Sequence, residues 1–104
     1  MAEMMRNLGQ AELFCDVIGT LAESPVWDER RQALFWCDIV EKKLHSFAPS
    51  SRTYWTCTLA DTVSCLGLCE SGRLIVACGM QILLVDPESD TVQTLVTIPA
   101  PDAL

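Results

Sequence analysis

The sequence predicts an all-β fold composed of two similar repeats, and three observations lead to this prediction. Short apolar or alternating runs recur along the 104-residue chain, with clusters of turn-forming residues between them. No ten-residue window has a convincing helical period of apolar residues. The pattern also repeats after about 40 residues, because ALFW at residues 33–36 aligns with RLIV at residues 73–76.

The first strand is predicted over residues 12–18, which read ELFCDVI and precede Gly19. Four further strands make up the first repeat. Turn-type clusters, DERR at residues 28–31 and PSS at residues 49–51, separate members of this group. The predicted strands of the first repeat are residues 25–27, 33–39, 43–47 and 53–59.

The second repeat begins after Ala60 and Asp61 and again holds four strands. Its turns are ESG at residues 70–72 and DPESD at residues 86–90, and both are rich in residues that favour tight turns. The predicted strands of the second repeat are residues 64–69, 73–78, 81–85 and 91–98.

Four short strands per repeat of about 40–50 residues is the layout of a β-propeller blade. A blade cannot bury both faces alone, and propellers close with about four to eight blades, so two blades form an incomplete ring. The edge and outer face of the second blade are then expected to be exposed. The alternative is a small β-sandwich of about eight strands. The expected organisation is a flexible N-terminus at residues 1–11, a strand latching the last blade at residues 12–18, blade one at residues 24–60 and blade two at residues 62–98.

Charge and hydropathy exclude several classes of partner. Seven basic against 14 acidic residues give a formal net charge of −7, which disfavours nucleic acid and anionic membrane surfaces. The first ten residues lack the order of a signal peptide. The longest apolar stretch, residues 74–85, is far shorter than the ~20 residues that span a bilayer. We therefore expect a soluble cytoplasmic protein without an evident obligate protein partner.

The cysteines predict buried reduced thiols rather than disulfides or zinc ligands. They lie inside apolar or alternating runs, and none forms a C-x-x-C pair. The six cysteines are Cys15, Cys37, Cys57, Cys65, Cys69 and Cys78.

A family resemblance rests on the motif AESPVWD at residues 22–28, followed by ALFWCDI at residues 33–39 and KLHSF at residues 43–47. With SGRLIVA at residues 71–77, these segments resemble the SMP-30/gluconolactonase (regucalcin-like) family over about residues 15–98. One departure is Ala22, where the family more often has glycine.

The resemblance implies a six-bladed propeller that opens sugar lactones and holds one divalent cation, Ca²⁺ or Zn²⁺, at the top of its channel. The glutamate of the opening motif is a metal ligand in the family, which assigns this role to Glu23. Pro25 favours extended backbone at Ser24, so we expect Glu23 to be held on a stiff entry to the innermost strand. The alternative is an ordinary exposed turn glutamate.

The family's other metal ligands and its R-x-N-D-G substrate segment map beyond Leu104. One carboxylate cannot coordinate a cation that takes about six to eight oxygens, and no residue is assigned as catalytic. The resemblance therefore implies the N-terminal part of a metal-dependent lactonase that is inactive alone. Two alternatives are a calcium-binding regulatory propeller without lactonase activity and a short β-rich interaction module.

The remaining candidates have structural interpretations. His45 is the one histidine and has no nucleophile at motif spacing, so no catalytic role is expected. Asp38 ends an aromatic strand and is expected to accept hydrogen bonds that hold the blade together. Trp27, Trp36 and Trp55 are expected to pack between blades, because aromatic rings bury large areas.

Overall fold

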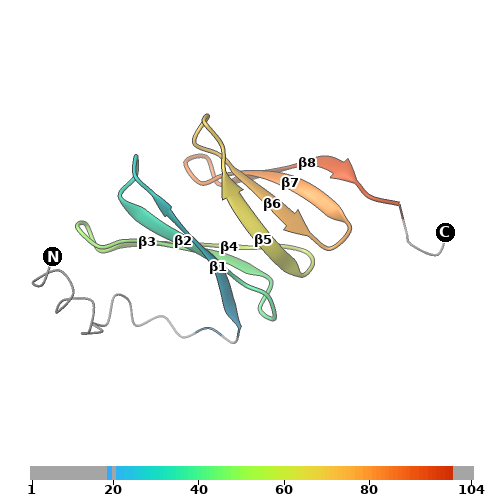
Figure 1. Cartoon of the computed structure of the whole chain (residues 1–104), viewed down its shortest axis with the longest axis horizontal. Coiled ribbons are helices and arrows are strands. Elements are labelled where there is room, and N and C mark those ends of the chain that lie inside the picture. Colours follow the sequence, from blue (N-terminus) through green and yellow to red (C-terminus); the bar gives the residue numbers. More distant parts are fainter. Residues whose placement is uncertain (1–18, 20, 100–104) are drawn as a thin grey trace, which may run out of the picture.

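The computed structural model describes residue 19 and residues 21–99, which form strands and the turns between them. The predicted all-β class is confirmed, and each predicted strand in this part of the chain is present (Figure 1). The predicted latch strand at residues 12–18 and the N-terminus at residues 1–11 lie outside the described residues. The strands are β1 (Ala22–Asp28), β2 (Ala33–Asp38), β3 (Lys43–Ala48), β4 (Thr53–Thr58), β5 (Val63–Leu68), β6 (Leu74–Cys78), β7 (Gln81–Asp86) and β8 (Thr91–Thr97).

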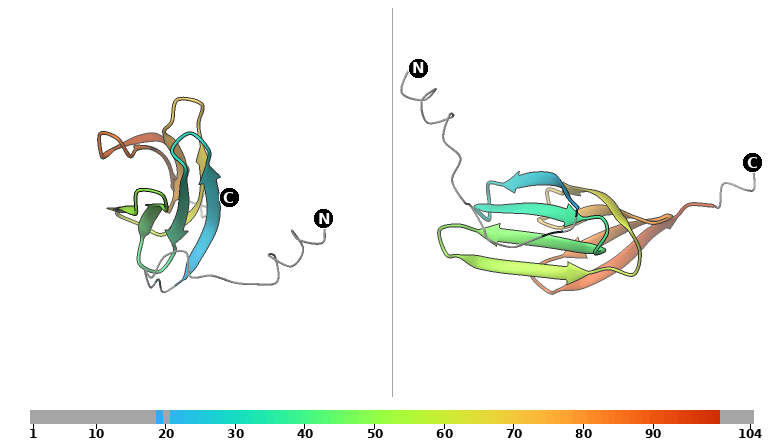
Figure 2. Two further views of the ribbon diagram at one scale, coloured as in Figure 1. Left: turned by 90° about the vertical axis from the view of Figure 1, so that its left-hand side faces the viewer. Right: turned by 90° about the horizontal axis from the view of Figure 1, so that it is seen from below.

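The strands form two antiparallel four-stranded sheets, ordered β1-β2-β3-β4 and β5-β6-β7-β8. Each sheet is a meander in which neighbours in the chain are also neighbours in space, as short tight turns require. The sheets contact each other where β1 and β2 meet β5. Figure 2 shows them as two adjoining layers that do not close into a ring.

The core lies between the two sheets. The face that the first sheet contributes to it and the face that the second sheet contributes are opposite faces of the repeated unit. Phe35 and Cys37 of β2 are buried on one side of this core, and Leu74 and Val76 of β6 are buried on the other. The repeats align after about 40 residues, so the aligned partner of Phe35 is Ile75. Ile75 lies between Leu74 and Val76, and it faces away from this core because side chains alternate along a strand. The sheets thus stack as consecutive repeats, each presenting its opposite face to the next.

The three tryptophans occupy different environments. The predicted inter-blade packing is confirmed for Trp55, and it stays a prediction for Trp27 and Trp36, which lie on the face turned away from the second sheet. Trp55 meets the Phe35 ring edge-on with centroids 6.1 Å apart, and its indole N–H donates to Oδ1 of Asp90 in the second sheet at 3.3 Å. Trp36 stacks on His45 within the first sheet, at 5.2 Å. Trp27 is 42% exposed. Trp27 and Trp36 lie on the face of the first sheet opposite Phe35, which explains the difference.

The five described cysteines are all free thiols. The expectation of burial holds for Cys37 and Cys78, whereas Cys57 and Cys69 are half-buried and Cys65 is exposed. Cys65 pairs with Ala77 on the open face of the second sheet, so its position in an alternating run did not ensure burial. Burial raises the pKa of the Cys37 and Cys57 thiols, which keeps both neutral near pH 7.

Candidate functional site

Glu23 is the second residue of β1, opposite Cys37 of β2, and its side chain is exposed. Its carbonyl oxygen accepts a hydrogen bond from the Cys37 thiol, with Sγ and O 3.4 Å apart. The backbone of Glu23 is thereby fixed to the sheet while its carboxylate reaches solvent. This arrangement suits a residue whose carboxylate supplies one oxygen to a metal ion outside the sheet.

The backbone after Glu23 differs from the sequence expectation. Ser24 has φ 54°, in the left-handed region, and a β-bulge interrupts the pairing between Glu23 and Val26. The predicted extended conformation of Ser24 is therefore wrong, because the bulge overrides the preference that Pro25 imposes. A left-handed φ at a non-glycine residue costs on the order of 1 kcal/mol. The bulge, rather than a stiff extended entry, sets the direction of Glu23.

Asp38 stabilises the same end of the first sheet. Its fully buried carboxylate accepts hydrogen bonds from the N–H groups of Leu21 at 3.3 Å and Glu41 at 3.0 Å. The Leu21 carbonyl in turn accepts from the Ile39 N–H at 3.0 Å. A Cβ at Gly19 would lie 2.8 Å from the Asp38 carboxylate, so the chain passes close to it. The predicted role of Asp38 as a hydrogen-bond acceptor is confirmed.

The side chains around Glu23 do not complete a metal site. Residues 19 and 21–99 contain no group of three or more His, Cys, Asp or Glu side chains that could hold a metal ion. In the same part of the chain, no buried side-chain nitrogen or oxygen lacks a hydrogen-bond partner. Glu23 fits the chemistry of one ligand to a hard cation, but a cation such as Ca²⁺ takes about six to eight oxygens. A complete coordination sphere therefore needs oxygens besides those of the acidic side chains in the described part of these two sheets.

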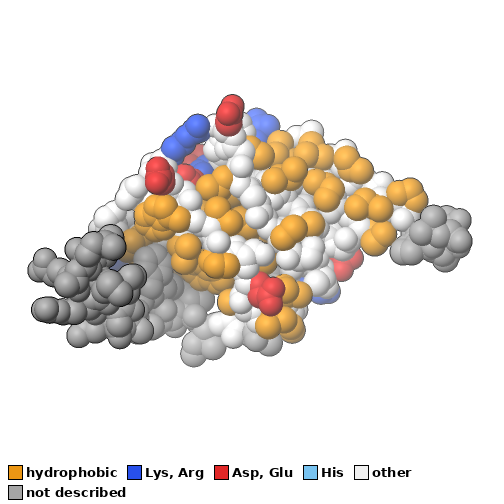
Figure 3. Space-filling model, in the orientation of Figure 1, with side chains coloured by type: hydrophobic (Ala, Val, Ile, Leu, Met, Phe, Trp, Pro, Cys, Tyr) orange, Lys and Arg blue, Asp and Glu red, His pale blue; other side chains and the backbone are white. Residues whose placement is uncertain are grey.

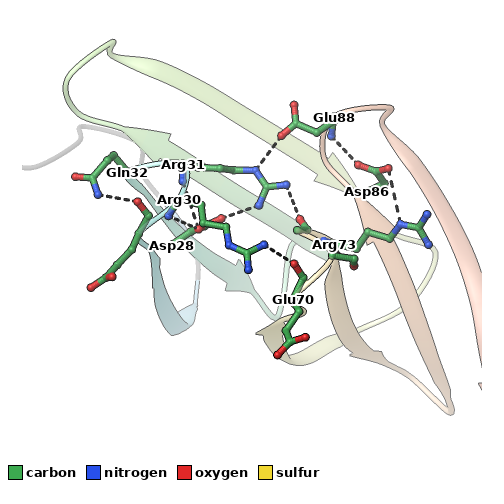
Figure 4. A network of polar contacts seen from close by, with 11 residues as sticks. Asp28, Arg30, Arg31, Gln32, Glu70, Arg73, Asp86 and Glu88 are labelled. Carbon is green, nitrogen blue, oxygen red and sulfur yellow. Dashed lines mark hydrogen bonds and ion pairs between the residues drawn. The ribbon is translucent and has the colours of Figure 1, made fainter.

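At the opposite end of β1, Arg31 joins the two sheets (Figure 4). Its Nη1 donates to Oδ2 of Asp28 at 2.6 Å, and its Nε donates to Oε1 of Glu88 in the second sheet at 2.9 Å. Its remaining nitrogen, Nη2, donates to the carbonyl of Gly72. The guanidinium also lies over the Phe35 ring, 5.6 Å from its centroid. One planar side chain thus binds a carboxylate of its own sheet and two acceptors of the next.

The charges of this network stabilise each other. Burial opposes ionisation of Asp28, but hydrogen bonds from the Arg31 side chain and from the N–H groups of Arg31 and Arg30 outweigh it, so the pKa of Asp28 lies below its usual value. Burial likewise lowers the pKa of Arg31, but Asp28 and Glu88 outweigh it and the pKa is raised. Both groups are therefore ionised near pH 7.

A groove of ≈ 340 Å³ lies beside this network, bounded in part by Asp28, Arg30, Cys69 and Glu70. Arg30 donates to the carbonyl of Glu70 across it, and Asp28 is engaged by Arg31. Arg30 and Asp28 are thus already engaged in hydrogen bonds of the network that joins the two sheets. The DERR segment at residues 28–31 was predicted as a turn only, and the contact that Arg31 makes with the second sheet was not expected, although two adjacent arginines in so acidic a chain are a usable signal.

His45 is a structural residue. It is buried between the rings of Trp36 and Tyr54, and its Nδ1 shares a hydrogen bond with the Tyr54 hydroxyl. Burial lowers its pKa, which favours the neutral imidazole. The side chain of His45 thus packs and forms hydrogen bonds within the first sheet.

Comparison with known proteins identifies the family and the fold to which this chain is similar. The profile described as "SMP-30/Gluconolactonase/LRE-like region" matches residues 21–103. Among curated proteins, 6-deoxy-6-sulfogluconolactonase of Pseudomonas putida is 41% identical over 66 residues, covering 64% of this chain and 23% of that protein. Regucalcin of Xenopus laevis is 27% identical over 78 residues, covering 75% of this chain and 26% of that protein.

Two solved structures resemble the chain. A luciferin-regenerating enzyme is matched with a TM-score of 0.66 and 31% identity, over 77% of this chain and 28% of that one. A calcium-binding protein, regucalcin, from Agrobacterium tumefaciens is matched with a TM-score of 0.70 and 20% identity, over 77% of this chain and 27% of that one. Both are six-bladed propellers, so the two sheets are propeller blades and the sandwich alternative is wrong. The chain spans about a quarter of the length of these relatives.

No helix among residues 19 and 21–99 has the length and apolar character of a membrane span.

Proposed function

The chain belongs to the SMP-30/gluconolactonase/LRE-like family, and on this premise we propose that it forms part of a metal-dependent hydrolase that opens sugar lactones to aldonic acids. The observation that carries the proposal is the family match over residues 21–103, together with 41% identity to a protein named as a sulfogluconolactonase. The acidic net charge of −7 suits a cation better than an anionic polymer.

Glu23 is the residue of this chain proposed to bind the metal. Its support is threefold: it stands in the family's opening motif, its carboxylate is exposed, and the thiol of Cys37 fixes its backbone. A carboxylate oxygen is a suitable ligand for Ca²⁺ and also for Zn²⁺. The two sheets contribute this one ligand, so the 104-residue chain alone is proposed to lack lactonase activity.

The test transplants the two sheets into a complete relative. Residues 21–103 would replace the corresponding two-blade segment of the Pseudomonas putida sulfogluconolactonase, and lactone opening would be followed by acid release in the presence of Ca²⁺ or Zn²⁺. We expect lactone opening by the chimera and none above buffer by the 104-residue chain. Glu23→Gln should reduce the activity of the chimera by at least about 100-fold, because a metal ligand loses its charge while keeping its shape.

Glu29→Gln is the matched control, because Glu29 is an exposed glutamate at the opposite end of β1. It should leave the activity of the chimera within about twofold. Equal effects of the two substitutions would contradict the role of Glu23, and metal-dependent activity of the 104-residue chain would contradict the proposal that it is inactive alone.

A second candidate function is calcium binding without lactonase turnover, which the similarity to two proteins named regucalcin favours. It requires the same Glu23 ligand but no substrate. A chimera that binds Ca²⁺ in a Glu23-dependent way and opens no lactone would favour this candidate.

A further inference from the structure

One residue inside a strand has a left-handed backbone, and it directly follows the proposed metal ligand. This residue is Ser24, which has φ 54° and lies in β1 next to Glu23. Strained backbone of this kind persists only where surrounding contacts hold it, and it is frequent at ligand sites. The other non-glycine residues with a positive φ in the described part of the chain all lie in turns between strands: Gln32, Lys42, Arg52 and Asp90.

The β-bulge after Glu23 interrupts the regular ladder between β1 and β2. It places two residues of β1, Ser24 and Pro25, opposite a single residue of β2. Pro25 has no backbone N–H and donates no ladder bond. Because a bulge bends its strand and re-aims the neighbouring side chain, the direction of the Glu23 carboxylate depends on the contacts that hold this bulge.

Cys37 of β2 supplies a contact that crosses the bulge. Its thiol is fully buried and donates to the Glu23 carbonyl, with Sγ and O 3.4 Å apart. Burial raises the pKa of this thiol, and a hydrogen bond with the Ser24 side chain opposes the rise. One thiol thus contacts both the residue before the bulge and the residue within it.

The second sheet has a bulge at the matching place without the strained residue. Its register shift lies between Val63 and Cys65 of β5, and no described residue of β5 has a positive φ. The Ser64 hydroxyl donates there to the Ala77 carbonyl at 3.3 Å. Ala77 aligns with Cys37, so a side chain crosses each bulge at the same register position. Only in the first sheet is this side chain a buried thiol that holds a left-handed residue.

Glu23 is an isolated carboxylate, so its own direction matters. Residues 19 and 21–99 hold no group of three or more His, Cys, Asp or Glu side chains that could bind a metal ion. Figure 3 shows acidic side chains on one face of the molecule standing apart from one another. A single carboxylate can join a metal site that other residues complete only if its strand fixes where it points.

We propose that Cys37 is a positioning residue for Glu23. Its thiol holds the Glu23 carbonyl across the bulge, keeps Ser24 in the left-handed conformation and so sets the direction of the metal-binding carboxylate. The inference rests on the proposed function, in which Glu23 binds the metal. Replacing a group that orients a metal ligand typically lowers metal affinity by about 10–100-fold.

The first experiment asks whether the thiol holds the bulge, and it needs no metal. Amide hydrogen exchange of the 104-residue chain would be read by mass spectrometry on a peptide that covers β1. Cys37→Ala should speed exchange in this peptide by about fivefold, the effect of one lost hydrogen bond, whereas Cys37→Ser keeps a donor and should stay within about twofold of the parent. Unchanged exchange in Cys37→Ala would overturn the proposal.

Cys78→Ala is the matched control. Cys78 is also buried, and its thiol donates to the Asp61 carbonyl at 3.3 Å in the second sheet. The substitution therefore removes a thiol with the same kind of bond and leaves β1 untouched. Exchange in the β1 peptide should stay at the parent rate, and circular dichroism would confirm that all three variants keep the β-rich spectrum.

The second experiment measures Ca²⁺ affinity by calorimetric titration of the chimera that carries residues 21–103. Cys37→Ala should weaken binding by at least about 10-fold, and Cys37→Ser should bind within about threefold of the parent. Cys78→Ala should leave the affinity unchanged. Equal losses in Cys37→Ala and Cys78→Ala would overturn the positioning role, as would a loss in Cys37→Ser as large as that in Cys37→Ala.

The two proposals fail in different ways. If the parent chimera binds Ca²⁺ through Glu23 and Cys37→Ala binds it as tightly, the positioning role is wrong and the proposed function stands. If the parent chimera shows no Glu23-dependent binding, the proposed function is wrong and the positioning role is overturned with it.

Discussion

The two sheets share one backbone plan but differ in their buried polar groups. All four buried polar side chains in the described part of the chain, those of Asp28, Asp38, His45 and Ser46, belong to the first sheet. The buried residues of β5 to β8 are Val63, Leu74, Val76, Cys78, Leu83 and Val85. The second sheet therefore shows that apolar alternation and turns suffice for the blade geometry. The first sheet has the same geometry and additional buried polar contacts.

One pair of equivalent positions shows this difference directly. The Ile39 N–H donates to the Leu21 carbonyl at 3.0 Å, and in the second sheet the Gly79 N–H donates to the Thr62 carbonyl at 2.8 Å. Beside the first bond, the Asp38 carboxylate accepts two N–H groups. Its aligned residue Cys78 makes one weak bond, from its thiol to the Asp61 carbonyl at 3.3 Å. The backbone connection is the same, whereas the side-chain support differs.

The largest expected difference in the free energy of unfolding is between substitutions of the aligned residues Phe35 and Ile75. Phe35→Ala should lower the free energy of unfolding by about 3–5 kcal/mol, because it leaves a cavity between the sheets. Ile75→Ala should cost less than about 1 kcal/mol, because Ile75 is exposed. Urea unfolding of the two variants and the parent chain measures both values. Similar losses would contradict the assignment of one covered and one open face.

The next contrast is between Asp38 and Cys78. Asp38→Ala should destabilise by about 2–3 kcal/mol, because two partly buried N–H groups lose a charged acceptor. Cys78→Ala removes one weak bond and a small apolar atom and should cost about 1 kcal/mol. The same urea titration compares them. A larger loss for Cys78→Ala would show that the polar support of the first sheet is unimportant.

Arginine substitutions test the contact between the sheets at the end of β1, where Arg31 lies. Arg31→Lys should cost about 1–2 kcal/mol, because an ammonium cannot bind Asp28, Gly72 and Glu88 together. Arg73→Lys is the control, because Arg73 is half-exposed and 4.0 Å from Asp86, and it should cost less than about 0.5 kcal/mol. Thermal unfolding distinguishes the two. Equal losses would mean that Arg31 does not join the sheets.

The smallest effect is a dependence of stability on pH. The pKa of Asp28 is lower in the folded chain than in the unfolded one, so its contribution is present above the ordinary pKa of 3.8 and is lost as the pH falls through the folded value. Stability should therefore decrease below about pH 5, and Asp28→Asn should flatten this decrease. Urea midpoints between pH 6 and pH 3 measure the slope. An unchanged slope in Asp28→Asn would contradict the contribution of this carboxylate.

The sequence predicted the strands well, because side-chain alternation and turn residues are local signals. The role of Asp38 as an acceptor was predicted from its place at a strand end and is confirmed, whereas the role of Glu23 rests on the resemblance of the opening motif and stays a prediction. The sequence did not predict the bulge at Ser24, because Pro25 suggests extended backbone. It also did not show that Arg31 reaches the second sheet or that Cys65 is exposed, because both depend on how the repeats stack. Contacts between repeats leave little local trace in the sequence.

The central claim is that this chain contributes one metal ligand, Glu23, to a site that its two sheets do not complete. Calorimetric titration with Ca²⁺ tests it most directly, on the 104-residue chain and on the chimera that carries residues 21–103. We predict no binding by the chain alone at micromolar concentration, one ion per molecule of the chimera, and loss of that binding in Glu23→Gln but not in Glu29→Gln. Undiminished calcium binding by the Glu23→Gln chimera would contradict the claim.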